Sequence, residues 1–86
     1  MTDREQLTKT ILDTIREVLI EKGLTPSNLS LETHLDAIKG IESLDWAVIV
    51  VRLEDSTGVD PFSQGLSREL RTANDLVEIY QSQLSP

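Results

Sequence analysis

The side chain in this sequence whose type and setting best suit chemistry is that of Ser43. It stands in the run 40–45, GIESLD, as a small hydroxyl between two carboxylates at the expected start of a helix. His34 and Asp36 would complete the residue types of a hydrolytic triad, but no pattern of a nucleophile elbow or an oxyanion hole accompanies them. A serine without an evident base is better interpreted as a place of attachment than as a nucleophile. We therefore expect a protein that is not an enzyme.

A purely structural role would also account for Ser43 and its neighbours. Serine is a preferred helix N-cap, and such a cap contributes about 1 kcal/mol to stability. Glu42 and Asp45 would be stabilised near the positive end of the helix dipole. We expect His34 to be a solvated loop residue, and we expect no metal site because the chain holds one histidine and no cysteine.

The composition is that of one small acidic domain spanning residues 1–86. Hydrophobic residues make up 38% of the chain but aromatic ones only 3%, so the core must be mostly aliphatic. The net charge of −7 would repel nucleic acid and anionic membranes and attract basic protein surfaces. Charges recur throughout residues 1–22, so we expect neither a signal peptide nor membrane insertion. The absence of cysteine is compatible with the cytoplasm, where we expect a monomer.

Apolar residues recur at the three-and-four spacing of amphipathic helices in three segments. The first spans about residues 3–22 and the second begins at residue 43 and ends at 56 or 57, each followed by a glycine. The last begins at Thr72, whose hydroxyl is placed to form a capping box with Asp75. A shorter helix is expected at 66–70. No strand-like alternation stands out, so the predicted fold is all-α: a small four-helix bundle of three principal helices and a short third one.

A long loop, residues 23–42, separates the first and second helices. About twenty residues without regular structure are unusual in a compact domain, so the loop is expected to be functional or partly structured. Thr25 and Pro26 suit the start of a single helical turn. Four apolar residues are spaced to anchor the loop on the core: Leu29, Leu31, Leu35 and Ile38.

The second helix has two apolar faces rather than one. At about 100° per residue, one face carries Trp46, Ile49, Val50, Leu53 and Thr57. A second strip, displaced around the helix and here called the outer strip, is formed by Leu44, Val48 and Val51. A domain of this size cannot bury both faces completely, so the outer strip is a candidate surface for a partner. The alternative is that the loop or the short third helix covers it.

Taken together, these features resemble the acyl carrier protein family. The run 40–44, GIESL, is similar to the G-x-D-S-L signature of these carriers, and peptidyl and D-alanyl carriers use related versions. The segment 72–80, TANDLVEIY, looks like the last helix of the family. An acidic chain of carrier size, with a helix and a long loop before the serine, supports a likeness that covers about residues 5–84.

The resemblance implies that phosphopantetheine, donated by coenzyme A, is attached to Ser43 by a phosphopantetheinyl transferase. The thiol at the end of this arm would carry an acyl or aminoacyl group as a thioester. A ligase would load that group, and downstream enzymes of lipid, fatty-acid or related biosynthesis would act on it. The carrier itself would perform no reaction.

Docking on these enzymes would use the acidic loop and the second helix. The residues expected to dock are Glu42, Leu44, Asp45, Val48, Val51 and Asp55. The family shelters the acyl chain inside the bundle, and the residues that would line such a pocket here are Trp46, Val50 and Leu53. Trp46 is explained equally well as a filler of the hydrophobic core.

The sequence also departs from the family pattern. Glu42 replaces the usual aspartate, Lys39 stands where a leucine usually precedes the glycine, and Val48 takes the place of a common acidic residue. The large Trp46 leaves less room for a long acyl chain. We therefore expect a specialised carrier of a short acyl or aminoacyl group rather than the housekeeping fatty-acid carrier.

A function of another class fits the same helices. An unmodified helical adaptor would bind a partner through Leu44, Val48 and Val51 without any group on Ser43. The two functions differ in whether Ser43 is modified. Within the carrier class, the sequence does not identify the pathway, which is fatty-acid, polyketide or peptide synthesis or cell-envelope modification.

Overall fold

The structure is a computed structural model that describes residues 4–25, 29–38, 40–61 and 71–84. These residues contain three α-helices. They are α1 (Arg4–Glu21), α2 (Ser43–Thr57) and α3 (Ala73–Leu84), and a 3₁₀ turn at Leu35–Ala37 precedes α2. No β-strand occurs among these residues, so the all-α prediction is confirmed. The short helix predicted at 66–70 lies outside the described residues.

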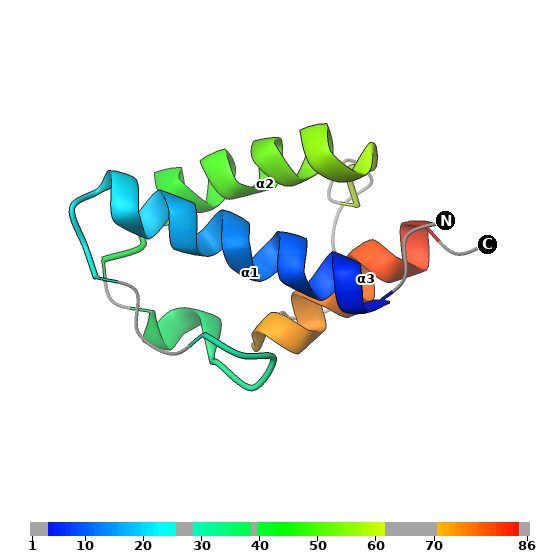
Figure 1. Cartoon of the computed structure of the whole chain (residues 1–86), viewed down its shortest axis with the longest axis horizontal. Coiled ribbons are helices and arrows are strands. Elements are labelled where there is room, and N and C mark those ends of the chain that lie inside the picture. Colours follow the sequence, from blue (N-terminus) through cyan, green and yellow to red (C-terminus); the bar gives the residue numbers. More distant parts are fainter. Residues whose placement is uncertain (1–3, 26–28, 39, 62–70, 85–86) are drawn as a thin grey trace.

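α1 is the helix on which the other two pack (Figure 1). α2 lies along α1 in the opposite direction, so the end of α1 meets the start of α2. The buried stripe of α1 follows the predicted spacing and consists of Leu7, Ile11, Thr14, Ile15, Val18 and Leu19. Its apolar members pack against Ile49 and Leu53 of α2 and against Leu76, Val77, Ile79 and Tyr80 of α3. Burial contributes about 1.5–3 kcal/mol for each large aliphatic side chain, so this cluster is the main source of stability.

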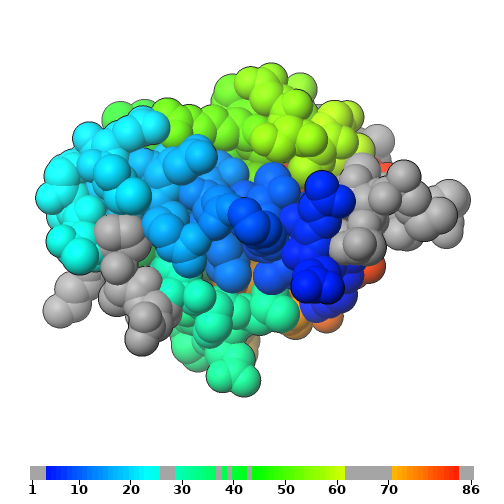
Figure 2. Space-filling model, viewed as in Figure 1, coloured from blue at the N-terminus to red at the C-terminus, as the bar shows by residue number. Residues whose placement is uncertain are grey.

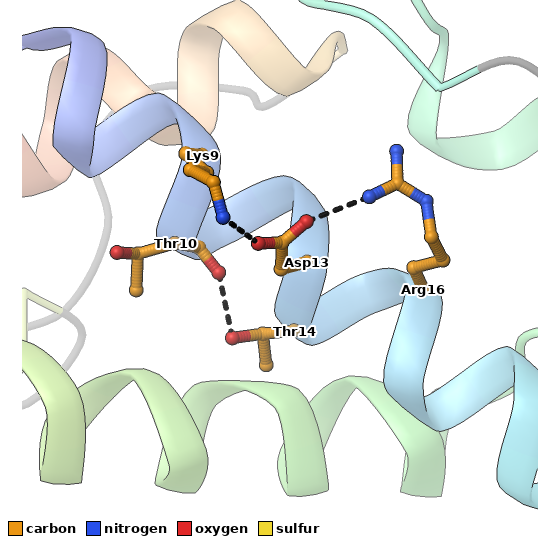
Figure 3. Close-up of polar contacts among 5 residues, drawn as sticks. All are labelled: Lys9, Thr10, Asp13, Thr14 and Arg16. Carbon is orange, nitrogen blue, oxygen red and sulfur yellow. Dashed lines mark hydrogen bonds and ion pairs between the residues drawn. The ribbon is translucent and has the colours of Figure 1, made fainter.

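Polar side chains of α1 pair with one another along the helix (Figure 3). Asp13 accepts hydrogen bonds from Lys9 at 3.0 Å and from Arg16 at 2.7 Å. Thr14 points toward α2, and its hydroxyl donates to the Thr10 carbonyl at 2.7 Å, which satisfies it within its own helix. Exposed ion pairs one turn apart contribute about 0.3–0.5 kcal/mol, so they add little to the core. None of the helices in the described ranges is long and apolar enough to cross a membrane.

The loop between α1 and α2 pairs with the start of α3, on the side of α1 away from α2 (Figure 2). The Leu35 amide donates to the Arg71 carbonyl at 2.8 Å, and the Ala73 amide donates to the Thr33 carbonyl at 2.9 Å. These bonds flank an isolated antiparallel bridge between His34 and Thr72. Because the first amides of a helix have no partner inside it, the loop satisfies the start of α3 while α3 orders the loop.

Apolar anchors hold the same loop on the core. Leu29, Leu31 and Ile38 are partly buried against the cluster, as the spacing predicts. Leu24 and Ile41, near the two ends of the loop, pack there as well. Leu35 is half-buried at the start of the 3₁₀ turn, whereas Pro26 of the predicted Thr25–Pro26 turn lies outside the described residues.

The predicted capping box at the start of α3 is confirmed. The Asp75 amide donates to the Thr72 hydroxyl at 3.3 Å, and Asp75 Oδ2 accepts from the Thr72 amide at 3.1 Å. The same oxygen accepts from the Arg71 amide at 2.9 Å. Two side chains thus fix the start of α3 at the point where the long loop joins it.

Candidate modification and docking site

Gly40 shapes the approach of the loop to α2. Its φ of +89° lies in the left-handed region, which residues with a β-carbon rarely adopt. A β-carbon at Gly40 would also lie 2.2 Å from Leu24 Cδ1, so the side chain of Leu24 occupies the space beside this glycine. The glycine of the GIESL run therefore has a local structural cause. Lys39, which departs from the family pattern, lies outside the described residues.

Ser43 is the first residue of α2, and the residue in the N-cap position is Glu42. The prediction that Ser43 is the N-cap is therefore wrong by one residue. Glu42 has extended backbone, with φ −116° and ψ 176°, and its amide donates to Asp45 Oδ2 at 2.8 Å. Because a side chain three residues later satisfies the Glu42 amide, the cap is built from Glu42 and Asp45. Ser43 begins the helix at the positive end of its dipole.

Lys22 joins the end of α1 to both sides of this helix start. Its ammonium donates to the Gly40 carbonyl and to Asp45 Oδ2, each at 2.5 Å. Both contacts lie at the surface, where 31% of the Lys22 side chain and 18% of the Asp45 side chain are exposed. The hydrogen bond from Lys22, followed by that from the Glu42 amide, lowers the pKa of Asp45 below its ordinary value. Sequence patterns did not point to Lys22, because its partners lie about twenty residues away.

The outer strip of α2 faces solvent, as the two-face pattern of the sequence indicates. Leu44 is 81% exposed, Val48 42% and Val51 58%. Val48 and Val51 line a shallow, mostly apolar hollow together with Ala47 and Arg52. Exposed apolar strips of this kind are typical of interaction surfaces, so the three predicted docking residues share one accessible face.

Two charged residues beside the strip, Arg52 and Asp45, are paired with residues of α1 or with Lys22 directly after it. Arg52 donates to both carboxylate oxygens of Glu21, at 2.6 and 2.8 Å, and lies 3.9 Å from Glu17. This pairing lowers the pKa of Glu21 and raises that of Arg52. Asp45 is engaged by Lys22, whereas the predicted docking residues Glu42 and Asp55 are exposed. Of the three predicted docking carboxylates, Asp45 is thus already bound within the protein, by Lys22.

The predicted acyl-pocket residues lie on the inner side of α2. Leu53 is fully buried in the core, Trp46 is partly buried and packs against it, and Val50 is half-buried. A separate, mostly polar hollow lies between α1 and α2, with Thr10, Asp13, Thr14, Glu17, Arg52, Asp55 and Ser56 along its walls. Packing by Trp46 and Leu53 supports their role in the core, while their role as pocket lining stays a prediction.

The triad residue types are not brought together as a described site. His34 is exposed, and its backbone pairs with Thr72 at the start of α3, away from the junction of α1 with α2. Among the described residues, no group of three histidine, aspartate or glutamate side chains could hold a metal ion. The contacts at the start of α2 are instead those of Lys22 with Gly40 and Asp45, which we call the junction. No protein-family model matches this sequence, and no solved structure matches it.

Proposed function

We propose that this chain is a carrier protein that holds acyl or aminoacyl intermediates as thioesters on a phosphopantetheine arm attached to Ser43. The observation that carries the proposal is the place of Ser43: it is the first residue of α2, between exposed Glu42 and 81%-exposed Leu44. The approach to it is a glycine turn at the end of a long, anchored loop. The resemblance of the GIESL run to carrier signatures supports the same role.

The chemistry required of the chain is limited to one hydroxyl. The Ser43 hydroxyl would attack the phosphorus of coenzyme A that bears the pantetheine arm, losing its proton and releasing adenosine bisphosphate. The base and the metal for this step belong to the transferase, which agrees with the absence of an evident base in the sequence around Ser43. When attached, the arm supplies a terminal thiol for thioester formation.

Partner enzymes would dock on the outer strip and on the exposed carboxylates beside it. The net charge of −7 would speed the approach of basic partner surfaces, and the apolar strip would provide the contact area. Asp45 is paired with Lys22 and Arg52 with Glu21, so neither offers an unpaired charge beside the strip. We propose that Glu42 and Asp55 provide the charged contacts and Leu44, Val48 and Val51 the apolar ones.

The proposal extends to the cargo and the setting. Trp46 and Leu53 already pack in the interior, which favours a short acyl or aminoacyl group over a long chain. We also propose that residues 66–70 form the short third helix of the predicted four-helix bundle, and that the protein acts as a monomer in the cytoplasm. A loading ligase and the downstream enzymes of one biosynthetic pathway would be its partners, together with the transferase.

The direct test is modification of the purified chain. The protein is incubated with coenzyme A, magnesium and a broad-specificity phosphopantetheinyl transferase, and its intact mass is recorded. We expect a gain of one phosphopantetheinyl unit, which Ser43→Ala abolishes and Ser56→Ala retains. Ser56 is a matched control because it is exposed near the other end of the same helix. An unmodified, folded wild-type chain after treatment with several transferases would refute the proposal.

The exposed outer strip also supports a second function, an unmodified helical adaptor. Its partner would contact Leu44, Val48 and Val51 directly, and binding would be independent of any group on Ser43. If the protein is an adaptor, Ser43→Ala should still bind the partner and support its function in cells, whereas Val48→Glu should not. The carrier predicts that Ser43→Ala loses activity.

A further inference from the structure

We propose that Lys22 is a positioning residue for the turn that bears Ser43. Its ammonium joins Gly40 to Asp45 and so holds the backbone on both sides of Ser43 against the end of α1. This inference rests on the proposed function, since it concerns how Ser43 is presented to the transferase.

The geometry encloses a short stretch of backbone. Gly40 lies three residues before Ser43 and Asp45 two residues after it, and both accept from the same ammonium. Asp45 Oδ2 also accepts from the Glu42 amide at 2.8 Å, so this oxygen is shared by Lys22 and the N-cap residue. The two bonds from Lys22 thus connect the first turn of α2 and the residue before its N-cap segment to the end of α1.

The place of Lys22 suits this role for electrostatic reasons. It directly follows α1, where the carbonyl end of the helix dipole favours a cation. An ammonium has three donors, and two of them are used here across two separate segments. The Lys22 side chain is 31% exposed, and both of its contacts lie at the surface of the molecule.

Fixing the turn in advance should matter for recognition. A long loop has many conformations, and ordering it during docking reduces affinity because only the competent fraction binds. Lys22 would keep that fraction high in the free protein. Its loss should therefore raise the KM of the transferase for this chain and leave kcat nearly unchanged, because the reacting groups themselves are not altered.

The test compares Lys22→Met, which removes the charge at similar length, with Lys22→Arg, which retains charge and donors. Lys9→Met is the matched control, because Lys9 lies in the first half of α1, far from Ser43, and likewise pairs with a carboxylate. Two quantities are measured: amide hydrogen exchange at Glu42 and Asp45, and the KM and kcat of modification. The midpoint of thermal unfolding verifies that each variant is folded.

We expect several-fold faster exchange at Glu42 and Asp45 and a several-fold higher KM for Lys22→Met, with substantial recovery in Lys22→Arg and no change in Lys9→Met. Unchanged exchange in a folded Lys22→Met variant would overturn the proposal, as would faster exchange with an unchanged KM. If the wild-type chain is not modified at all, the proposed function fails. The exchange measurement then still shows whether Lys22 holds this turn.

Discussion

The side chain of Leu24 occupies the space into which a β-carbon at Gly40 would project, 2.2 Å from Leu24 Cδ1. Gly40→Ala should therefore destabilise the protein in two ways. A residue with a β-carbon at φ +89° costs about 1–2 kcal/mol, and the end of the Leu24 side chain must in addition shift. Gly58→Ala is the control, because Gly58 has a φ of +79° but nothing within 4 Å of the added carbon. Urea unfolding should show a larger loss for Gly40→Ala, and equal losses would contradict the role of Leu24.

The two faces of α2 should respond differently to the same kind of truncation. Leu53→Ala removes a fully buried side chain and should lower the free energy of unfolding by about 2–5 kcal/mol. Val51→Ala, two residues earlier and 58% exposed, should change it by less than about 0.5 kcal/mol. The fluorescence of Trp46, the single tryptophan, can follow both transitions. A large loss for Val51→Ala would mean that the outer strip is covered.

A charge placed on the outer strip should reduce docking without unfolding the protein. Val48→Glu puts a carboxylate beside Leu44 and Val51, where it loses hydration when an apolar partner surface covers it. We expect a several-fold higher KM for the transferase and a change in unfolding free energy below about 0.5 kcal/mol. Ser56→Glu adds the same charge to an exposed position near the end of α2. Equal effects of the two variants on KM would refute docking on the strip.

Protonation of Asp45 should weaken its contact with Lys22, and it should occur at a pH below the ordinary pKa of aspartate. The folded-state pKa of Asp45 is lowered, first by its hydrogen bond from Lys22 and then by that from the Glu42 amide. The contribution of ionised Asp45 to stability is therefore present above its ordinary pKa of 3.8 and is lost as the pH falls through the lower folded-state value.

Titration of the Asp45 carboxyl carbon by NMR measures this pKa directly. Lys22→Met should raise it toward the ordinary value, while the Glu42 amide keeps part of the shift. Asp45→Asn should also remove the contribution of this group to the pH dependence of unfolding. The same Asp45 pKa in wild type and Lys22→Met would contradict the contact between the two side chains.

Local patterns in the sequence determined much of the helical architecture. Spacing and a following glycine predicted α2 from Ser43 to Ser56 or Thr57, and the helix ends at Thr57. The spacing also predicted its buried and exposed faces. The Thr72–Asp75 cap of α3 was also predictable. These features depend on residues three or four positions apart, whose relative placement is set by helix geometry. The N-cap of α2 was misplaced by one residue, since serine and glutamate both stood at the boundary.

The tertiary structure decided what lies around Ser43. It brought Lys22 onto Gly40 and Asp45, and it paired the loop backbone with the start of α3. It also placed Leu24 against Gly40. Such contacts join segments whose separation follows from the path of the whole chain over the core, and the periodicity of a single segment carries no information about that path. The sequence alone therefore determined which serine begins α2, and the tertiary structure decided what holds that helix start in place.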